Sequence, residues 1–264
     1  MSFMIIYLAG GAIAGVLAGL LGIGGGLVIV PILTFAFGSL GFPHEHILHM
    51  ALGTSLASIL FTSVSSLKAH HGRGAVLWPV VFRITPGILA GTFAGAWIAA
   101  QLSTNFLKGF FGVFLLYVAT QMLLGFKPKA SRELPGTPGM FGAGSVIGIF
   151  SSLVGIGGGT LSVPFLVWHN TLVHSAIGTS AAIGFPIALA GTLGYITSGL
   201  SSQGMPPYTI GFINLTALGG IVAASVCTAP LGAKLAHSLP VDKLKRTFAV
   251  LLYIVGSRMI WSIF

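Results

Sequence analysis

The sequence has very little charge, since only 6% of its 264 residues are Asp, Glu, Lys or Arg. Soluble domains carry about 25%, and a soluble fold could not cover its surface with so few charges. The only acidic residues are Glu45, Glu133 and Asp242, which we expect in loops or at their edges. No carboxylate is then left in the apolar segments to bind sodium or a metal ion, which argues against a cation transporter.

The sequence also lacks the motifs of several other protein classes. A single cysteine, Cys227, cannot form an internal disulfide. We find no Ser/His/Asp set, zinc motif or phosphate loop, so we expect no enzyme activity, no cofactor and no metal site. The formal charge is +9, but the basic residues are scattered over short loops, which does not predict nucleic-acid binding. The N-terminal MSFMIIYLAGG lacks the basic region of a signal peptide, so we expect the first apolar segment to be retained.

Long apolar runs are abundant instead. Hydrophobic residues make up 55% of the chain, and long apolar runs occur, for example, at 3–21, 47–67 and 105–125. Runs of about 18 or more such residues are long enough to cross a bilayer as helices. The sequence therefore predicts an all-α integral membrane protein.

Three sequence blocks recur in the same order, which indicates an internal repeat. GIGGG begins at Gly22 and at Gly155, and HMALGTSLA at His49 is matched by HSAIGTSAA at His174. LSTNFLKGFFGVFLLY begins at residue 102, and LPVDKLKRTFAVLLYI at residue 239. We therefore predict a first transmembrane repeat over 1–126 and a second over 140–264. The polar, Pro- and Gly-containing stretch 127–139 is the expected cytoplasmic linker.

Each half contains five apolar segments, of which the second is short. The segments are 3–21, 27–38, 47–67, 75–101 and 105–125 in the first half, and 140–154, 160–170, 173–199, 207–236 and 243–263 in the second. A helix of about 12 residues covers about 18 Å, against about 30 Å of hydrocarbon. The short segments are therefore expected to be either tilted and shared with their neighbours or re-entrant.

Basic residues predict the orientation, because they are enriched in cytoplasmic loops. They cluster at Lys68 and Arg73, in the linker, and at Lys243–Arg246. All three clusters lie inside if the linker is cytoplasmic and each half crosses the membrane an odd number of times. The uncharged loop 200–206, which matches 68–74 in the repeat, then lies outside. We therefore predict two inverted repeats, with both chain ends outside.

The glycine-rich segments predict a helix break at matched places in both halves. A glycine inside a helix costs about 1 kcal/mol relative to alanine, and broken backbone is tolerated at membrane depth only within protein or beside water. The apolar run after each break, LVIVP or TLSVP, would begin a half-helix whose first N–H groups have no partner and carry partial positive charge. Such an end can hold an anion without a charged side chain. The expected binding residues are Gly24, Gly25, Gly26, Gly157, Gly158 and Gly159.

Close helix packing is the alternative explanation for these glycines. Glycines four residues apart let membrane helices approach closely, and two such series occur at Gly11, Gly15, Gly19 and at Gly87, Gly91, Gly95. We interpret those series as packing faces. The GIGGG segments lack the four-residue spacing and precede Pro31 and Pro164, so we prefer the helix break for them.

The triplet GTS also occurs once in each half, with hydroxyls at Thr54, Ser55, Thr179 and Ser180. A hydroxyl in a membrane helix often bonds back to its own turn, but hydroxyls at matched places are also candidate donors to an oxyanion. His49 and His174 precede the triplets by about one turn. They are candidates for proton coupling, with an interfacial position or pairing in the core as alternatives.

Arg83 is a further candidate because it lies within an apolar segment, where ionisable residues are costly. The repeat aligns FRIT with INLT, so we expect Arg83 to match Asn214, and a pair of polar groups at matched depth fits a substrate cavity. The alternative is that Arg83 snorkels toward the cytoplasmic side.

Together these motifs resemble the TauE/SafE family of sulfite and organosulfonate exporters. The resemblance rests on GIGGG followed by VP in both halves, the two GTS triplets, and GFINL at Gly211–Leu215, and it spans nearly the whole chain. It implies a multi-pass permease of the inner, or plasma, membrane that moves small sulfur-containing anions outward. The family motif maps here onto Gly22–Gly26, Thr54, Ser55, Gly155–Gly159, Thr179, Ser180 and Asn214, whereas Arg83 is suggested by the residues alone.

We therefore predict a permease that exports sulfite or an organosulfonate by alternating access around a midplane anion site between the halves. Proton coupling is a hypothesis that rests on the lack of a sodium-type carboxylate site and on the two matched histidines. The alternatives are a passive anion channel and a non-transporting membrane scaffold. The expected partners are the anion and membrane lipid, with a homo-oligomer left open.

Overall fold

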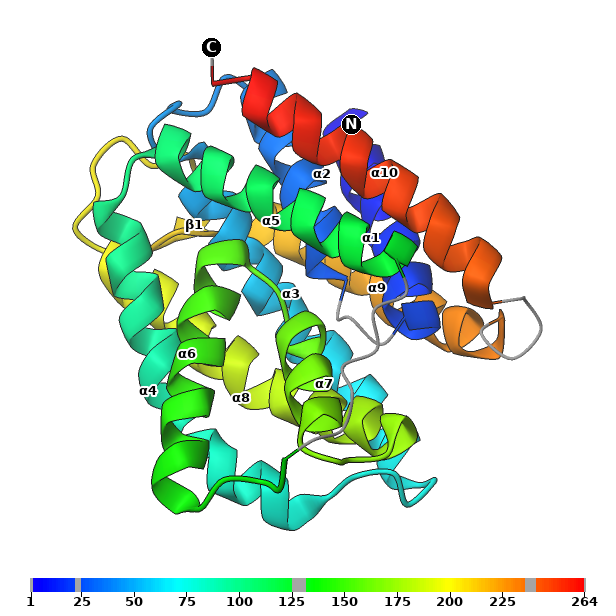
Figure 1. Cartoon of the computed structure of the whole chain (residues 1–264). Coiled ribbons are helices and arrows are strands. Elements are labelled where there is room, and N and C mark those ends of the chain that lie inside the picture. Colours follow the sequence, from blue (N-terminus) through cyan, green and yellow to red (C-terminus); the bar gives the residue numbers. More distant parts are fainter. Residues whose placement is uncertain (1, 22–24, 125–131, 236–240, 264) are drawn as a thin grey trace.

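The computed structural model describes residues 2–21, 25–124, 132–235 and 241–263. These residues form ten helices and one short hairpin (Figure 1). In chain order the elements are α1 (Ser2–Leu21), α2 (Gly26–Ser39), α3 (Ile47–His71), α4 (Trp78–Gln101), α5 (Thr104–Leu124), α6 (Thr137–Val154), α7 (Gly159–Trp168), α8 (Val173–Gly199), β1 (Thr209–Ile210), β2 (Ile213–Asn214), α9 (Leu215–Leu235) and α10 (Val241–Trp261). The predicted all-α architecture is confirmed.

The described helices have the length and surface of a membrane protein. Five of them, α3, α4, α5, α6 and α8, are long and apolar enough to cross a bilayer. Large apolar side chains such as Phe82, Phe106 and Val146 are exposed, as is expected of surfaces that face lipid rather than water. The most buried of the five are α3 and α8, which form the centre of the protein.

The helices follow the predicted order of five segments per half, with α1–α5 in the first and α6–α10 in the second. The short second segments are short helices, α2 with 14 residues and α7 with 10. At 1.5 Å per residue they span about 21 and about 15 Å, less than a bilayer core. Helix α6 begins at Thr137 rather than at 140, and positions 127–131 of the predicted linker lie outside the described residues.

The ninth apolar segment, expected over 207–236, is not one continuous element. Its first part forms the hairpin, in which β1 pairs antiparallel with β2, and α9 begins only at Leu215. The backbone is left-handed at Tyr208 (φ 59°) and Gly211 (φ 56°), a conformation that a right-handed helix excludes. Apolar composition alone could not separate the hairpin from the helix.

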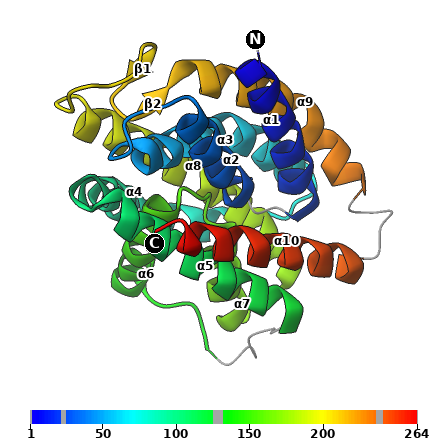
Figure 2. The same cartoon turned by 90° about the horizontal axis from the view of Figure 1, so that it is seen from above.

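The helices pack in pairs that connect the two halves. Helix α1 lies along α9, α4 along α6, α3 along α8, and α5 along α10. If each helix is replaced by its equivalent in the other half (α1 by α6, α4 by α9), the α1–α9 pair becomes the α6–α4 pair. The α3–α8 and α5–α10 pairs each consist of two equivalent helices and are left unchanged. The α3–α8 pair lies between the α1–α9 and α4–α6 pairs, while α5 and α10 lie side by side at one side (Figures 1 and 2).

The two central helices run in opposite directions. Gly53 near the start of α3 lies against Tyr195 near the end of α8, where a Cβ at Gly53 would be 3.0 Å from the Tyr195 Cβ. Farther along, Ser63 of α3 lies opposite Gly184 of α8. Equivalent helices that meet antiparallel support the inverted repeat, which stays a prediction.

The spaced glycines form packing faces, as predicted. A Cβ at Gly87 would lie 2.9 Å from the Phe141 Cα, and a Cβ at Gly91 would lie 2.5 Å from the Ser145 Cα, so α4 and α6 touch backbone to backbone. At a second seam a Cβ at Gly11 would lie 2.8 Å from the Cα of Ile221, where α1 meets α9. These two contacts are the tight seams that join the halves.

Candidate functional site

The second glycine-rich segment interrupts the helical chain between α6 and α7. Helix α6 ends at Val154 and α7 begins at Gly159, and every residue from 151 to 160 is buried. Gly155 (φ 66°) and Gly158 (φ 40°) have left-handed backbone, which glycine adopts without the steric cost of a side chain. The predicted break within the protein is confirmed here.

The first glycine-rich segment begins its half-helix in the same way. Gly25 has φ 76°, and its carbonyl oxygen accepts hydrogen bonds from the N–H groups three and four residues ahead, as the carbonyl of Gly158 does at the start of α7. Residues Gly22–Gly24 lie outside the described residues, so the prediction for Gly24 has no structural description.

The two breaks meet in the protein interior. A Cβ at Gly26 would collide with the carbonyl oxygen of Gly155 and lie 3.0 Å from the Cα of Ile156. The start of α2 therefore rests on the backbone of the second break. Ser55 of α3 donates a hydrogen bond of 2.8 Å to the same Gly155 carbonyl, so the structure brings Gly26 and Ser55 together at this point.

The threonine of each GTS triplet holds the start of a helix in the other half. Thr54 Oγ1 accepts a hydrogen bond from the Asn214 N–H, and Thr179 Oγ1 accepts one from the Leu77 N–H, both at 3.0 Å. Asn214 and Leu77 immediately precede α9 and α4. These hydroxyls therefore have backbone partners within the protein, and they fix equivalent helices in the two halves.

The same bonds correct the repeat alignment that the sequence suggested. They make Leu77, not Arg83, the counterpart of Asn214. Arg83 is exposed on α4 near its first residue, Trp78, which fits the snorkelling alternative. Asn214 is buried, and its Oδ1 accepts a 2.9 Å hydrogen bond from the Ala217 N–H, which caps α9. The structure does not bring Arg83 and Asn214 to one cavity.

The two matched histidines lie in different environments. His49 is buried, and its Nε2 lies 3.0 Å from Leu102 O and 3.1 Å from Ala99 O. Its ring stacks on Phe212, with 5.2 Å between ring centroids. His174 is exposed at the start of α8. Only His49 is therefore enclosed by the protein.

Four buried hydroxyls around the second break were not all anticipated from the sequence. Among the described residues, seven buried hydroxyls make no hydrogen bond, and four of them, those of Ser151, Thr160, Ser162 and Ser180, lie around the second break. The Ser162 hydroxyl lies beside the break, because a Cβ at Gly158 would be 3.2 Å from its Oγ. Hydroxyls without hydrogen-bond partners therefore lie at and beside the first turn of α7.

Ser180 belongs to the same region through helix α8. It shares a helix face with Ile183 and Ile187, three and seven residues ahead. The side chains of both isoleucines contact the position where Gly158 would carry a Cβ, at 3.6 and 2.8 Å. Ser180 therefore lies on the face of α8 that covers the second break.

The first break has no equivalent hydroxyls on its half-helix. The places of Thr160 and Ser162 are taken by Leu27 and Ile29, which are buried. The sequence shows this difference as TLSVP after the second GIGGG and LVIVP after the first. We did not identify these hydroxyls from the sequence because we compared the halves for shared residues. The second break is the polar one of the two.

The groups at the second break are suited to an oxyanion. They are backbone N–H groups at a helix start, where the helix dipole is positive, and hydroxyls that can donate a hydrogen bond. Across the described part of the chain, no group of three or more His, Cys, Asp or Glu side chains is placed to hold a metal ion. The chemistry available here is hydrogen-bond donation to a small anion.

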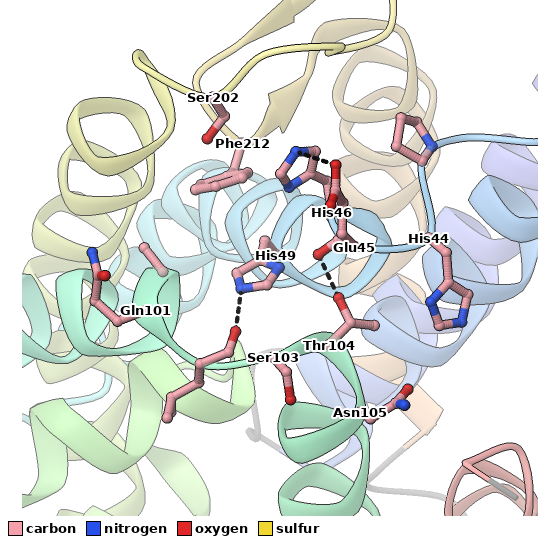
Figure 3. A pocket seen from close by; sticks show the side chains of 13 residues that line it. His44, Glu45, His46, His49, Gln101, Ser103, Thr104, Asn105, Ser202 and Phe212 are labelled. Carbon is pink, nitrogen blue, oxygen red and sulfur yellow. Dashed lines mark hydrogen bonds and ion pairs between the residues drawn. The ribbon is translucent and has the colours of Figure 1, made fainter.

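A separate cavity of about 700 Å³ lies at the start of α3. Figure 3 shows its walls, which come from the α2–α3 loop, the α4–α5 connection, Ser202 and Phe212. His49 is the only residue predicted from the sequence as functional that lines it. None of its lining residues belongs to the glycine breaks.

Comparison with known proteins gives a consistent picture. The sequence profile described as "Sulfite exporter TauE/SafE" matches residues 7–259. A "Probable membrane transporter protein" of Haemophilus influenzae is 38% identical over 260 residues, which cover 98% of each chain. Proteins with the same description from Methanocaldococcus jannaschii and Bacillus subtilis are 28% and 26% identical, over 95% and 88% of this chain and 92% and 89% of their own.

Proposed function

The chain belongs to the sulfite exporter TauE/SafE family of membrane transporters, and on that premise we propose that it exports a small sulfur-containing anion, sulfite or an organosulfonate. The proposed binding site is the second glycine break with the start of α7. Its membrane would be the inner, or plasma, membrane. Transport of this kind requires no covalent chemistry from the protein, so catalytic residues are not part of the proposal.

The observation that carries the proposal is the set of buried hydroxyls without partners at a helix start. A buried polar group left unpaired costs about 1–3 kcal/mol, and four such groups lie around the second break. An oxyanion would supply the missing acceptors and would be favoured by the positive end of α7. No charged side chain is needed, which keeps the site open to anions of different size and charge.

We assign the predicted residues, together with Thr160 and Ser162, two different roles in this site. The binding groups are the backbone N–H groups of Gly157 and Gly158 and the hydroxyls of Thr160, Ser162 and Ser180, while the Gly159 N–H donates to the Gly157 carbonyl and holds the turn between them. The supporting groups, which have protein partners, are Gly25, Gly26, Thr54, Ser55, Thr179 and Asn214. Arg83 and His174 are exposed and lie outside the proposed site.

The packing supports alternating access between the two halves. Gly26 of the first half rests on Gly155 of the second, so the breaks form a contact about which the halves could move. The antiparallel α3–α8 pair runs through the same region, and inverted repeats with discontinuous helices commonly carry transporter sites near the midplane. We propose that the bound anion is exposed to one side of the membrane at a time.

Anion flux into proteoliposomes tests this proposal. Purified protein should carry radiolabelled sulfite and methanesulfonate with saturable kinetics, and each should compete with the other. Dimethyl sulfone, a neutral molecule close to methanesulfonate in size, should neither compete nor be carried by the protein. Liposomes without protein give the background.

Each alternative function gives a different result in the same experiment. A passive channel would give currents that rise linearly with anion concentration and no competition. A membrane scaffold would give no flux above background for any of the anions. Equal flux of dimethyl sulfone and methanesulfonate would contradict an anion site.

A further inference from the structure

The cavity at the start of α3 is surrounded by basic groups. The imidazoles of His44, His46 and His49 line it, and Lys108 Nζ lies 3.2 Å from His44 Nε2. Glu45 is the only acid in the wall, and its side chain is 77% exposed and 3.5 Å from His46. Within the described residues, Lys108 is buried and has no carboxylate at salt-bridge distance. Its charge is therefore left without a counter-ion.

The first turn of α5 opens into the same cavity. Ser103, Thr104 and Asn105 line the wall, and Ser103 caps the helix by accepting a 3.2 Å hydrogen bond from the Phe106 N–H. The N–H groups of Thr104 and Asn105 precede the first intrahelical hydrogen bond and have no partner within the helix. This 21-residue helix therefore directs its positive end at the cavity.

His49 adds a buried group without a partner. Its Nε2 faces two carbonyl oxygens, Leu102 O and Ala99 O, so Nε2 must carry a proton. Its Nδ1 is buried and has no hydrogen-bond partner among the described residues. Figure 3 shows the ring between Phe212 and Thr104 at the cavity wall. When the ring is protonated it carries a positive charge, and an anion held in the neighbouring cavity favours this form by electrostatic attraction.

We infer that this cavity is a second anion site, which binds a small oxyanion together with a proton on His49. The inference rests on the proposed anion transport, since it places the cavity on the path between the second break and one aqueous side. Ser202 of the cavity wall belongs to the loop that the basic-residue pattern predicts to be outside. The occupant is therefore the transported anion at the outer mouth.

Other titratable side chains near the cavity contribute to the electrostatic potential at His49. They are His44, Glu45 and His46 from the α2–α3 loop and Lys108 from α5. The α4–α5 connection and the wall residues Ser202 and Phe212 add no titratable side chain. A pH effect that disappears with His49 alone would therefore separate this ring from its neighbours.

Calorimetric titration of the purified full chain with sodium sulfate tests the inference. Sulfate is chosen because its charge is constant between pH 6 and pH 8. We expect sulfate to bind at least tenfold more tightly at pH 6 than at pH 8, because a proton taken up with the ligand raises affinity as pH falls. His49→Gln should remove this dependence, since glutamine can still donate to the two carbonyls but cannot take up a proton.

Two further variants keep the test decisive. His174→Gln changes the exposed counterpart of His49 and should leave sulfate binding and its pH dependence unchanged. Asn105→Asp places a negative charge on an exposed wall position and should weaken binding at least tenfold at both pH values. No sulfate binding at pH 6, or a pH dependence that survives His49→Gln, would overturn the inference.

The titration also separates this site from the one at the second break. In protein that carries Ser162→Ala and Ser180→Ala, sulfate should still bind with the pH dependence that His49 confers, although anion flux falls at least tenfold. Loss of the pH-dependent binding in that protein would contradict a second site. Normal flux by protein in which the cavity binds no sulfate would overturn this inference and leave the proposed function standing.

Discussion

Replacing Ser162 and Ser180 together by alanine should lower the flux of sulfite and methanesulfonate at least tenfold without lowering the melting temperature. Both hydroxyls are buried and make no hydrogen bond, so removing them breaks no hydrogen bond within the protein. A hydrogen bond to a charged group contributes about 1.5–3 kcal/mol, and each 1.4 kcal/mol changes an affinity about tenfold. The loss should therefore appear only when the anion binds.

The repeat supplies a matched control for this prediction. Ser55 is the counterpart of Ser180 in the first half, but its hydroxyl donates to the carbonyl of Gly155. Ser55→Ala should therefore lower stability by about 1 kcal/mol, which a thermal melt in detergent detects. Full flux in the Ser162→Ala and Ser180→Ala protein, or a melting temperature that falls as much as in Ser55→Ala, would contradict the assignment.

Replacing Gly91 by leucine should prevent the protein from reaching its folded state. A Cβ at this position would lie 2.5 Å from the Cα of Ser145 and collide with its carbonyl oxygen. Backbone cannot rotate away as a side chain can, so α4 and α6 would have to separate along the seam that joins the halves. We expect no monodisperse peak on size-exclusion chromatography of the detergent extract.

Gly142→Leu is the matched control for this second prediction. Gly142 lies on the exposed side of α6, and a Cβ there would meet nothing within 4 Å. Leucine favours a helix by about 1 kcal/mol over glycine, so this variant should elute as the natural protein does. Equal elution of the Gly91 and Gly142 variants would show that the seam tolerates separation.

The features predicted well from the sequence depend on local pattern. The lengths of the apolar runs predicted the membrane helices, and the four-residue spacing of glycines predicted the packing face at Gly87 and Gly91. The GIGGG break also followed from local chemistry, because glycines disfavour a helix and release backbone N–H groups. These signals act within one or two turns, where chain neighbours decide the structure.

The features that the sequence left open depend on which segments meet. From the sequence, the hydroxyls of the GTS threonines were candidates to bind a ligand. In the structure they accept hydrogen bonds from backbone N–H groups at the starts of α9 and α4 instead. The similarity of FRIT and INLT suggested a pair that the hydrogen bonds of Thr54 and Thr179 replace with Leu77 and Asn214. His49 and His174 match in sequence, yet only His49 is covered by the residues around Phe212. Such differences arise from contacts between distant segments, which the local sequence patterns do not reveal.

The most direct test of the central claim is to locate a bound anion by anomalous diffraction. Selenate, which has the shape and charge of sulfate, can be introduced into crystals of the full chain and found by its selenium signal. The account predicts a peak at the start of α7, within hydrogen-bond distance of the hydroxyls of Ser162 and Ser180, with or without a second peak beside His49. Crystals with strong selenate peaks elsewhere and none at the second glycine break would contradict it.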